Sequence, residues 1–231
     1  MKRISILTGA GMSAESGIST FRDSNGLWEN HDISEVATPE GFRRNPALVL
    51  EFYNQRRRQL LEVQPNAGHL ALVELEKAFN VHVITQNVDD LHERAGSSKV
   101  VHLHGELRKS RSTANENLVY NCDVDIRIGD CCERGSQLRP HIVWFGEMVP
   151  LLETAAELVA QSDLVLIIGT SMQVYPAASL VNYALPGTPM YYIDPNPAIS
   201  YELARMNNLK VLAEVASTGC RKVVDELMSI A

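Results

Sequence analysis

The stretch TGAGMSAESGISTFRDSNGLW, residues 8–28, follows a short apolar run at residues 3–8. Residues 9–14 (GAGMSA) have the spacing G-x-G-x-x-G/A of a dinucleotide-binding turn. The first glycine permits the bend, the second lets a pyrophosphate approach the backbone, and the small third residue allows close helix packing. The free N–H groups of the following helix would then bind phosphate. The alternative is a glycine-rich turn that holds no ligand.

Apolar runs in the rest of the chain place this turn in an α/β domain. Short continuous apolar segments alternate with longer segments of helical pattern, which is typical of a parallel sheet covered by helices on both faces. Strands are expected at 3–8, 81–85, 100–103, 163–169, 189–194 and 210–213. Helices are expected at 46–63, 67–79, near 89–95, 151–161, near 176–185 and 217–229.

Two segments lack this periodicity. Residues 19–45 are expected to form a long functional loop, and the polar residues 106–140, with three of the four cysteines, a small inserted lobe. The expected organisation is a single catalytic domain, 1–231. Its large lobe is expected at approximately 1–30, 80–105 and 141–231, and its small lobe at approximately 31–79 and 106–140.

Composition excludes several classes of protein. The net charge of -7 argues against a general nucleic-acid binder. No apolar run approaches the roughly 18 residues that span a membrane. The first residues are too short a run for a secretory signal, and four cysteines do not suggest a disulfide framework. We therefore expect a cytoplasmic protein without membrane or nucleic-acid partners.

The second half of the opening stretch differs from the sequence pattern of a dehydrogenase. Such enzymes need an acidic residue about 20 positions after the turn, at the end of a second strand, to hold the ribose. Here that span is a loop in which Asp23 follows Phe21 and Arg22. We expect the loop to cover a cofactor, with Arg22 near phosphate or ribose and Phe21 shielding the reactive carbon.

Polar residues follow two of the predicted strands. Gln86, Asn87 and Asp89 come after strand 81–85, where an open parallel sheet binds ligands, and their polar side chains could hold a cofactor. An Asx turn that caps the next helix is the alternative. His104 follows strand 100–103, and a neutral imidazole is a suitable general base near pH 7, although single histidines are often structural.

Five blocks of sequence together resemble the sirtuins, a family of NAD-dependent protein deacylases. They have the family's order, spacing similar to the family's, and span nearly the whole chain. They are GAGMSAESGISTFR (9–22), TQNVD (85–89), LHGE (103–106), PHIVWFGE (140–147) and GTSMQVYP (169–176). The resemblance implies a Rossmann-like sheet with a helical insert and a small lobe that corresponds to a degenerate zinc-binding module.

The resemblance also implies a reaction. The acyl-lysine carbonyl oxygen attacks C1′ of the nicotinamide ribose, which expels nicotinamide and forms an alkylimidate. His104 deprotonates the ribose hydroxyls, the 2′-oxygen attacks the imidate carbon, and water then yields lysine and O-acyl-ADP-ribose. NAD is thus a consumed co-substrate, and acylated lysines of proteins are the partners. An ADP-ribosyltransferase and a non-catalytic NAD-binding sensor are the alternatives.

Site residues are carried over by the same resemblance. The catalytic residues are expected to be His104 and Asn87. The cofactor-binding residues are expected to be Gly9, Ala10, Gly11, Ser13, Phe21, Arg22, Trp28, Gln86, Asn87, Val88, Asp89, Gly169, Thr170, Ser171, Asp194, Pro195, Asn196 and Cys220. For Cys220 the expected contact is through its backbone to adenine, with core packing as the alternative. A strand at 142–145 with Val143 and Phe145, followed by Gly146 and Glu147, is expected to dock the peptide, with plain sheet core as the alternative.

The acyl group is suggested by the helix at 46–63. Tyr53 and Arg56 are three residues apart and share a face, so a guanidinium and a phenol could bind one carboxylate. A solvated basic face made by Arg56, Arg57 and Arg58 is the alternative. The pair resembles the Tyr-x-x-Arg of the sirtuin branch that removes succinyl and malonyl groups, where a small residue, here Ala37, leaves room for the acid. We expect removal of succinyl, malonyl and acetyl groups.

The expected small lobe differs from that of most sirtuins in its cysteines. Most sirtuins hold a structural zinc on two Cys-x-x-Cys pairs, and zinc takes four ligands in a tetrahedron. Here Ser110 and Ser112 stand where the first pair is expected, and Cys122, Cys131 and Cys132 form no Cys-x-x-Cys. We therefore expect no bound zinc and a lobe held by packing.

Overall fold

A six-stranded parallel sheet forms the centre of the molecule. The computed structural model describes residues 1–19, 27–28, 31–199, 201–205 and 207–231. The strand order is β11-β10-β9-β1-β4-β5. The strands are β1 (Arg3–Thr8), β4 (Asn80–Thr85), β5 (Val100–His102), β9 (Leu164–Ile168), β10 (Met190–Ile193) and β11 (Leu209–Leu212). This sheet confirms the predicted fold class.

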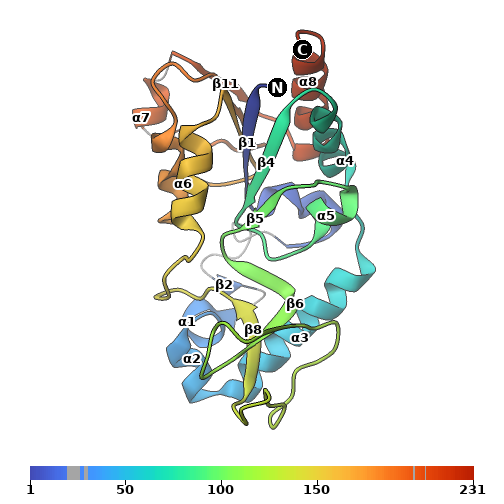
Figure 1. Ribbon diagram of the computed structural model, residues 1–231, viewed down its shortest axis with the longest axis vertical. Coiled ribbons are helices and arrows are strands. Elements are labelled where there is room, and N and C mark those ends of the chain that lie inside the picture. Colours follow the sequence, from blue (N-terminus) through green and yellow to red (C-terminus); the bar gives the residue numbers. More distant parts are fainter. Residues whose placement is uncertain (20–26, 29–30, 200, 206) are drawn as a thin grey trace.

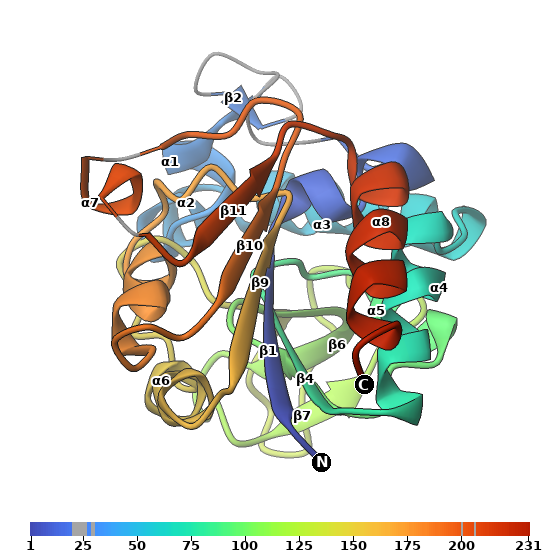
Figure 2. The same ribbon diagram turned by 90° about the horizontal axis from the view of Figure 1, so that it is seen from above.

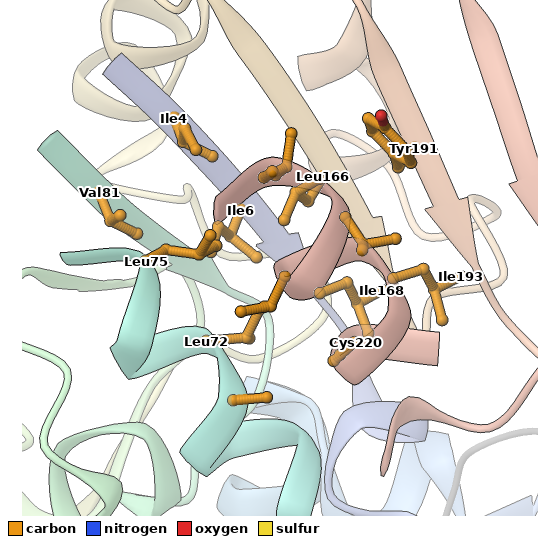
Figure 3. Packing of buried hydrophobic residues seen from close by; sticks show 14 of the residues in the cluster. Ile4, Ile6, Leu72, Leu75, Val81, Leu166, Ile168, Tyr191, Ile193 and Cys220 are labelled. Atoms are coloured by element: carbon orange, nitrogen blue, oxygen red, sulfur yellow. The ribbon is translucent and has the colours of Figure 1, made fainter. Parts of the chain in front are cut away.

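Helices cover both faces of the sheet, as Figure 2 shows. One face carries α4 (Ala67–Glu74) with a 3-10 turn (Leu75–Lys77), and α8 (Ala216–Met228). The other carries α6 (Leu152–Ala160) and the 3-10 helix η5 (Ala177–Tyr183). Successive strand residues point to opposite faces, so strands covered on both sides must be apolar throughout. In Figure 3, Ile6 and Ile168 of the strands meet Leu72 of α4 and Cys220 of α8.

The strand order creates a crevice. From β1 the chain passes to β4 and β5 on one side of the sheet, and later to β9, β10 and β11 on the other. The side of the sheet on which successive strands are added therefore changes next to β1, although all six strands stay parallel. Thr8 at the end of β1 is level with Thr85 of β4 and Ile168 of β9. The carboxyl ends of strands at such a switch point are where open α/β sheets bind ligands.

A small lobe lies beyond this edge, in the lower half of Figure 1. Its antiparallel sheet has the order β7-β6-β8. Its elements are β6 (Gly105–Ser112), β7 (Val119–Asn121), β8 (Leu138–Ile142), α1 (Ile33–Val36), α2 (Pro39–Arg44) and α3 (Pro46–Glu62). The side chains of Asp32, Thr38 and Asn45 cap the starts of the three helices. The segment 33–44, predicted to be loop, is therefore mostly helical.

Several other boundaries differ from the predictions. Residues 67–77 pack with α8 on the large sheet, so they share the core of the large lobe rather than that of the small lobe. Strand β8 ends at Ile142, so the strand predicted at 142–145 is wrong beyond that residue. The remaining described elements are α5 (Leu91–Ala95), α7 (Tyr201–Ala204) and the two-residue pair β2 (Leu27–Trp28) and β3 (His31–Asp32). No helix in these described ranges is long and apolar enough to cross a membrane.

Candidate active site

A cavity of about 480 Å³ lies at the carboxyl ends of β1, β4, β9 and β10 and extends to the small lobe. This volume is within the range of small-molecule sites. The structure brings most of the predicted residues together here. Those that line the cavity are Gly9, Ala10, Gly11, Ser13, Ala37, Tyr53, Arg56, Gln86, Asn87, Val88, Asp89, His104, Val143, Phe145, Gly146, Glu147, Gly169, Thr170, Ser171, Asp194, Pro195 and Asn196.

Four predicted residues are not among this lining. Phe21 and Arg22 lie outside the described residues, and Trp28 contributes its backbone to β2. Cys220 is fully buried in the core, where burial raises the pKa of its thiol to about 12. The packing alternative therefore accounts for the Cys220 side chain.

The glycine turn is shaped by the end of β9. Two short 3-10 helices (Ala10–Met12 and Ala14–Ser16) follow Gly9, instead of the single helix that was expected. The N–H of Gly11 donates to the Gly169 carbonyl at 2.8 Å, and a Cβ on Gly11 would lie 2.7 Å from the Gly169 Cα. Contact between two backbone turns therefore requires Gly11, a constraint beyond the predicted approach of a pyrophosphate.

Buried polar side chains meet beside this turn. The Ser13 hydroxyl donates to Asp89 Oδ2 at 2.8 Å and accepts from Asn87 Nδ2 at 3.1 Å. The Leu91 N–H donates to Asp89 Oδ1, so Asp89 also forms the Asx turn that the alternative interpretation expected directly before α5. Burial raises the pKa of Asp89, and the two donors oppose that shift. These hydrogen bonds fix the three side chains before any ligand arrives.

His104 is held in one tautomer. Its Nδ1 lies 3.0 Å from the Gln86 carbonyl oxygen. A carbonyl only accepts, so Nδ1 carries the proton and Nε2 carries the lone pair. Burial lowers the pKa of His104, and the hydrogen bond from Nδ1 to Gln86 opposes this. A neutral imidazole at pH 7 can accept a proton at Nε2.

His102, two residues earlier, has a protein partner at each of its two ring nitrogens. Its Nδ1 lies 3.2 Å from the Asn87 carbonyl oxygen, and its Nε2 lies 2.6 Å from Glu93 Oε1. Burial lowers the pKa of His102, but Glu93, together with Glu106 and the Asn87 carbonyl, opposes it, and the net direction is upward. His102 therefore ties the Asn87 backbone to α5, while His104 faces the cavity.

Tyr53 and Arg56 line the small-lobe end of the same cavity as Ala37. Tyr53 is fully buried, and its phenol oxygen accepts from Trp144 Nε1 at 3.0 Å. Burial raises the pKa of Tyr53, so the phenol is protonated at neutral pH. The Arg56 guanidinium stacks on the Phe52 ring at 3.3 Å and donates to the Phe52 carbonyl at 2.5 Å.

The arginines of this helix have three different environments. Arg57 is buried, and it donates to the Leu107 carbonyl and to Asn54. Arg58 lies at the surface and pairs with Glu51 and Asp125. The alternative of one solvated basic face therefore describes only Arg58.

Backbone hydrogen bonds hold the segment 142–147, which is expected to dock a peptide. The Val143 N–H donates to the His104 carbonyl at 2.9 Å, and the Phe145 N–H donates to the Ala37 carbonyl at 3.0 Å. The Glu147 carboxylate accepts from Arg111, Arg139 and the Trp144 N–H. Glu147 thus anchors the segment.

Sequence reasoning missed Trp144 and Arg139. Trp144 was within a quoted block, PHIVWFGE, but no pattern pointed to Tyr53, 91 positions away. Arg139 stacks on the Trp144 ring at 3.3 Å, a contact that follows from the path of β8 and the segment after it. No local signal in the sequence could have found either contact.

The small lobe does not offer a zinc site in its described residues. Zinc needs four ligands, but Ser112 accepts a hydrogen bond from Cys132 Sγ, and Cys122 Sγ donates to the Val124 carbonyl. No group of three or more His, Cys, Asp or Glu side chains able to hold a metal occurs in the part of the chain that the structure describes. The donors present therefore do not fit the family's zinc module.

A Rossmann-like sheet whose glycine turn, buried amides and histidine share one cavity defines an enzyme that uses a nucleotide. The sequence model of the Sir2 family matches residues 9–176. An NAD-dependent protein deacylase of Helicobacter pylori (strain ATCC 700392 / 26695) is 63% identical over 195 residues, covering 84% of this chain and 85% of the relative. Another, of Bacteroides thetaiotaomicron, is 54% identical over 229 residues, covering 96% and 97%.

Solved structures agree with these sequence matches. A Sir2 homolog in complex with NAD has a TM-score of 0.88 and 38% identity, covering 99% of this chain and 90% of that one. A structure described as the structural basis of sirtuin substrate affinity has a TM-score of 0.79 and 30% identity, covering 96% and 93%. The chain belongs to the Sir2 family.

Proposed function

We propose that this chain removes acidic acyl groups, succinyl and malonyl, from protein lysines. Membership of the Sir2 family, with the name that its close relatives share, makes the chain an NAD-dependent protein deacylase. The acyl preference rests on one observation. Tyr53 and Arg56 line the same cavity as His104, at its small-lobe end.

The residues present fit NAD as a substrate. The turn at 9–13 and residues 169–171 lie together at the ends of β1 and β9, where an open α/β sheet receives the phosphates of a nucleotide. The prearranged Ser13, Asn87 and Asp89 would hold the nicotinamide end. Asp194, at the end of β10 and also in the lining, would lie near the adenosine ribose.

The chain's own part in the reaction is to hold the two substrates and move one proton. The acyl-lysine carbonyl would displace nicotinamide at C1′ of the ribose. His104 Nε2 then takes a proton from a ribose hydroxyl, because its lone pair is available and its lowered pKa keeps the ring neutral at pH 7. The carbonyl of Gln86 keeps Nδ1 protonated and stabilises the imidazolium that results.

The acyl end of the cavity is suited to a carboxylate. A guanidinium and a protonated phenol both donate, and hydrogen bonds between charged groups are about twice as strong as neutral ones. The Phe52 carbonyl takes one of the five guanidinium N–H groups of Arg56 and fixes its plane. The small side chain of Ala37 leaves room beside them.

The test compares wild type with Arg56→Met on succinyl- and acetyl-lysine forms of one peptide. Methionine keeps the apolar stem but removes the charge. We expect kcat/KM for the succinyl peptide to fall about 10- to 150-fold, the equivalent of about 1.5–3 kcal/mol for a hydrogen bond to a charged group. The acetyl peptide should lose far less.

Arg58→Met is the matched control, because Arg58 is on the same helix but pairs at the surface with Glu51 and Asp125. It should leave both rates close to those of wild type. Equal losses for the two peptides in Arg56→Met would contradict the proposed acyl preference.

A further inference from the structure

The strand order indicates which end of the cavity receives the adenosine of NAD. The glycine turn follows β1, and Gly169 follows the neighbouring strand β9 (Figure 2). Asn87 and His104, which would meet the nicotinamide and its ribose, follow β4 and β5 on one side of this centre. With the pyrophosphate at the centre, the adenosine extends to the other side, toward the end of β10.

Two carboxylates line the cavity on that side, at what we call the adenosine end: Glu15, Asp194, Asn196 and Val215. Asp194 directly follows β10 and is 1% exposed, and its Oδ1 accepts the Asn196 N–H at 2.8 Å. Glu15 accepts from the N–H and the hydroxyl of Ser217, in the first turn of α8. These two bonds hold Glu15 at the start of the helix that packs on β10.

Basic side chains are scarce at the adenosine end. In the part of the lining that the structure describes, the only Lys or Arg is Arg56, which belongs to the acyl end. Lys222, on α8 nearby, pairs with Glu214. Arg22, expected near phosphate or ribose, lies outside the described residues. An adenosine in this place would therefore meet two acidic side chains and, among the described lining residues, no basic one.

We propose that Asp194 makes the protein select NAD over NADP, the dinucleotide with a further phosphate on the 2′-oxygen of its adenosine ribose. The inference rests on the placement of NAD proposed above and is independent of the acyl preference. Near neutral pH such a phosphate carries about −1.5 to −2 charges, and bringing it beside a buried carboxylate is unfavourable. The repulsion needs only the charge of Asp194, not a vacant oxygen.

An acidic residue has a comparable place in dehydrogenases. It lies about 20 positions after the glycine turn and binds the ribose of NAD, whereas an arginine nearby accommodates the phosphate of NADP. Here Asp32 is at about that distance from the turn, but it belongs to a separate two-stranded sheet and caps α1. Asp194, from the other half of the chain, would bring the acidic group to the ribose instead.

Calorimetry of NAD and NADP binding to wild type, Asp194→Asn and Asp225→Asn tests the proposal without any peptide. Asparagine keeps the shape and an oxygen that can accept the Asn196 N–H, but it removes the charge. In Asp194→Asn, the ratio of the Kd for NADP to the Kd for NAD should fall at least about tenfold, mainly because NADP binds more tightly. Asp225→Asn removes a charge from the surface of α8, outside the cavity lining, and should leave the ratio at its wild-type value.

Four results would overturn the proposal. Wild type that binds NADP as tightly as NAD would have no selectivity to explain, and an unchanged ratio in Asp194→Asn would remove Asp194 from it. A fall caused only by weaker binding of NAD would make Asp194 a ribose-binding or structural residue. An equal fall in Asp225→Asn would trace the selectivity to the net charge of the protein.

A second variant, Asp194→Ser, covers the case in which Asp194→Asn does not fold, because a serine hydroxyl can also accept the Asn196 N–H. It should lower the ratio in the same direction, and an unchanged ratio would refute the proposal. The outcomes also separate this inference from the proposed function. Wild type that does not bind NAD would contradict the proposed placement of NAD, whereas tight binding of NAD with an unchanged ratio in the variants refutes the role of Asp194 alone.

Discussion

Acid should destabilise the protein through a pair of buried histidines beneath the glycine turn. His69 of α4 and His92 of α5 are both buried, with ring centroids 4.8 Å apart. His92 Nε2 hydrogen-bonds to Thr8 Oγ1 at 3.1 Å, at the end of β1. Among the described residues, neither His69 Nε2 nor His92 Nδ1 has a hydrogen-bond partner. A proton added to either ring would therefore be a buried charge without an acceptor.

The pKa shifts give the size of the effect. Burial lowers the pKa of His69 from 6.5 to about 4, and it lowers the pKa of His92 well below the ordinary value. Between the ordinary pKa of each histidine in the unfolded chain and its lowered pKa in the folded chain, the unfolded chain binds a proton that the folded chain does not. The free energy of unfolding therefore falls as the pH falls. From about pH 7.5 to about pH 5, His69 alone should cost about 2 kcal/mol. That corresponds to a loss of about 4–8 °C in melting temperature for a domain of this size.

Urea unfolding at the two pH values tests this, with His69→Gln and His92→Gln as the perturbations. His69→Gln should show a loss on acidification smaller by about 2 kcal/mol, and His92→Gln should also show a smaller loss than wild type, because one titrating group is gone in each. His102→Gln is a control in which the effect of pH has the opposite sign. Glu93 contributes to the raised pKa of His102, so the interaction between these two side chains stabilises the folded protein in acid. Full acid sensitivity in both His69→Gln and His92→Gln would refute the reasoning.

Three further predictions concern the site. The acidic limb of the pH profile of kcat/KM should lie below pH 6.5, because burial lowers the pKa of His104, and His104→Ala should bind NAD and melt normally but lose turnover. Gly11→Ala should lower stability by about 1–3 kcal/mol in thermal melts and weaken NAD binding, because its Cβ would meet the Gly169 backbone. Finally, Phe21→Ala with Arg22→Ala should weaken NAD binding in calorimetry; an unchanged affinity would contradict the predicted covering loop.

Much of the large lobe could be predicted because its strands are buried on both faces. Burial on both sides requires continuous apolar runs, and these are visible without any tertiary information. The location of the site follows from the same pattern, since polar residues directly after such strands must gather at one edge of the sheet. His104 and Asn87 could be predicted in this way, and the structure places both in the cavity lining.

The parts that could not be predicted depend on single side chains or on distant partners. The short helices α1 and α2 span only four and six residues, which is too short for a helical period to be recognised in the sequence, and the side chains of Asp32 and Thr38 cap them. The bond between Trp144 and Tyr53 joins residues 91 positions apart. The functional residues of the acyl pocket could therefore be suggested from the sequence, but the groups that orient them could not.

The most direct test of the account is mass spectrometry of one peptide carrying acetyl-, succinyl- or malonyl-lysine, incubated with NAD and either wild type or His104→Ala. The account predicts faster loss of the succinyl and malonyl groups with wild type, equimolar release of nicotinamide, appearance of the O-acyl-ADP-ribose, and no turnover with His104→Ala. A peptide that keeps its acyl group and gains ADP-ribose, or one that stays unchanged while NAD is bound, would contradict it.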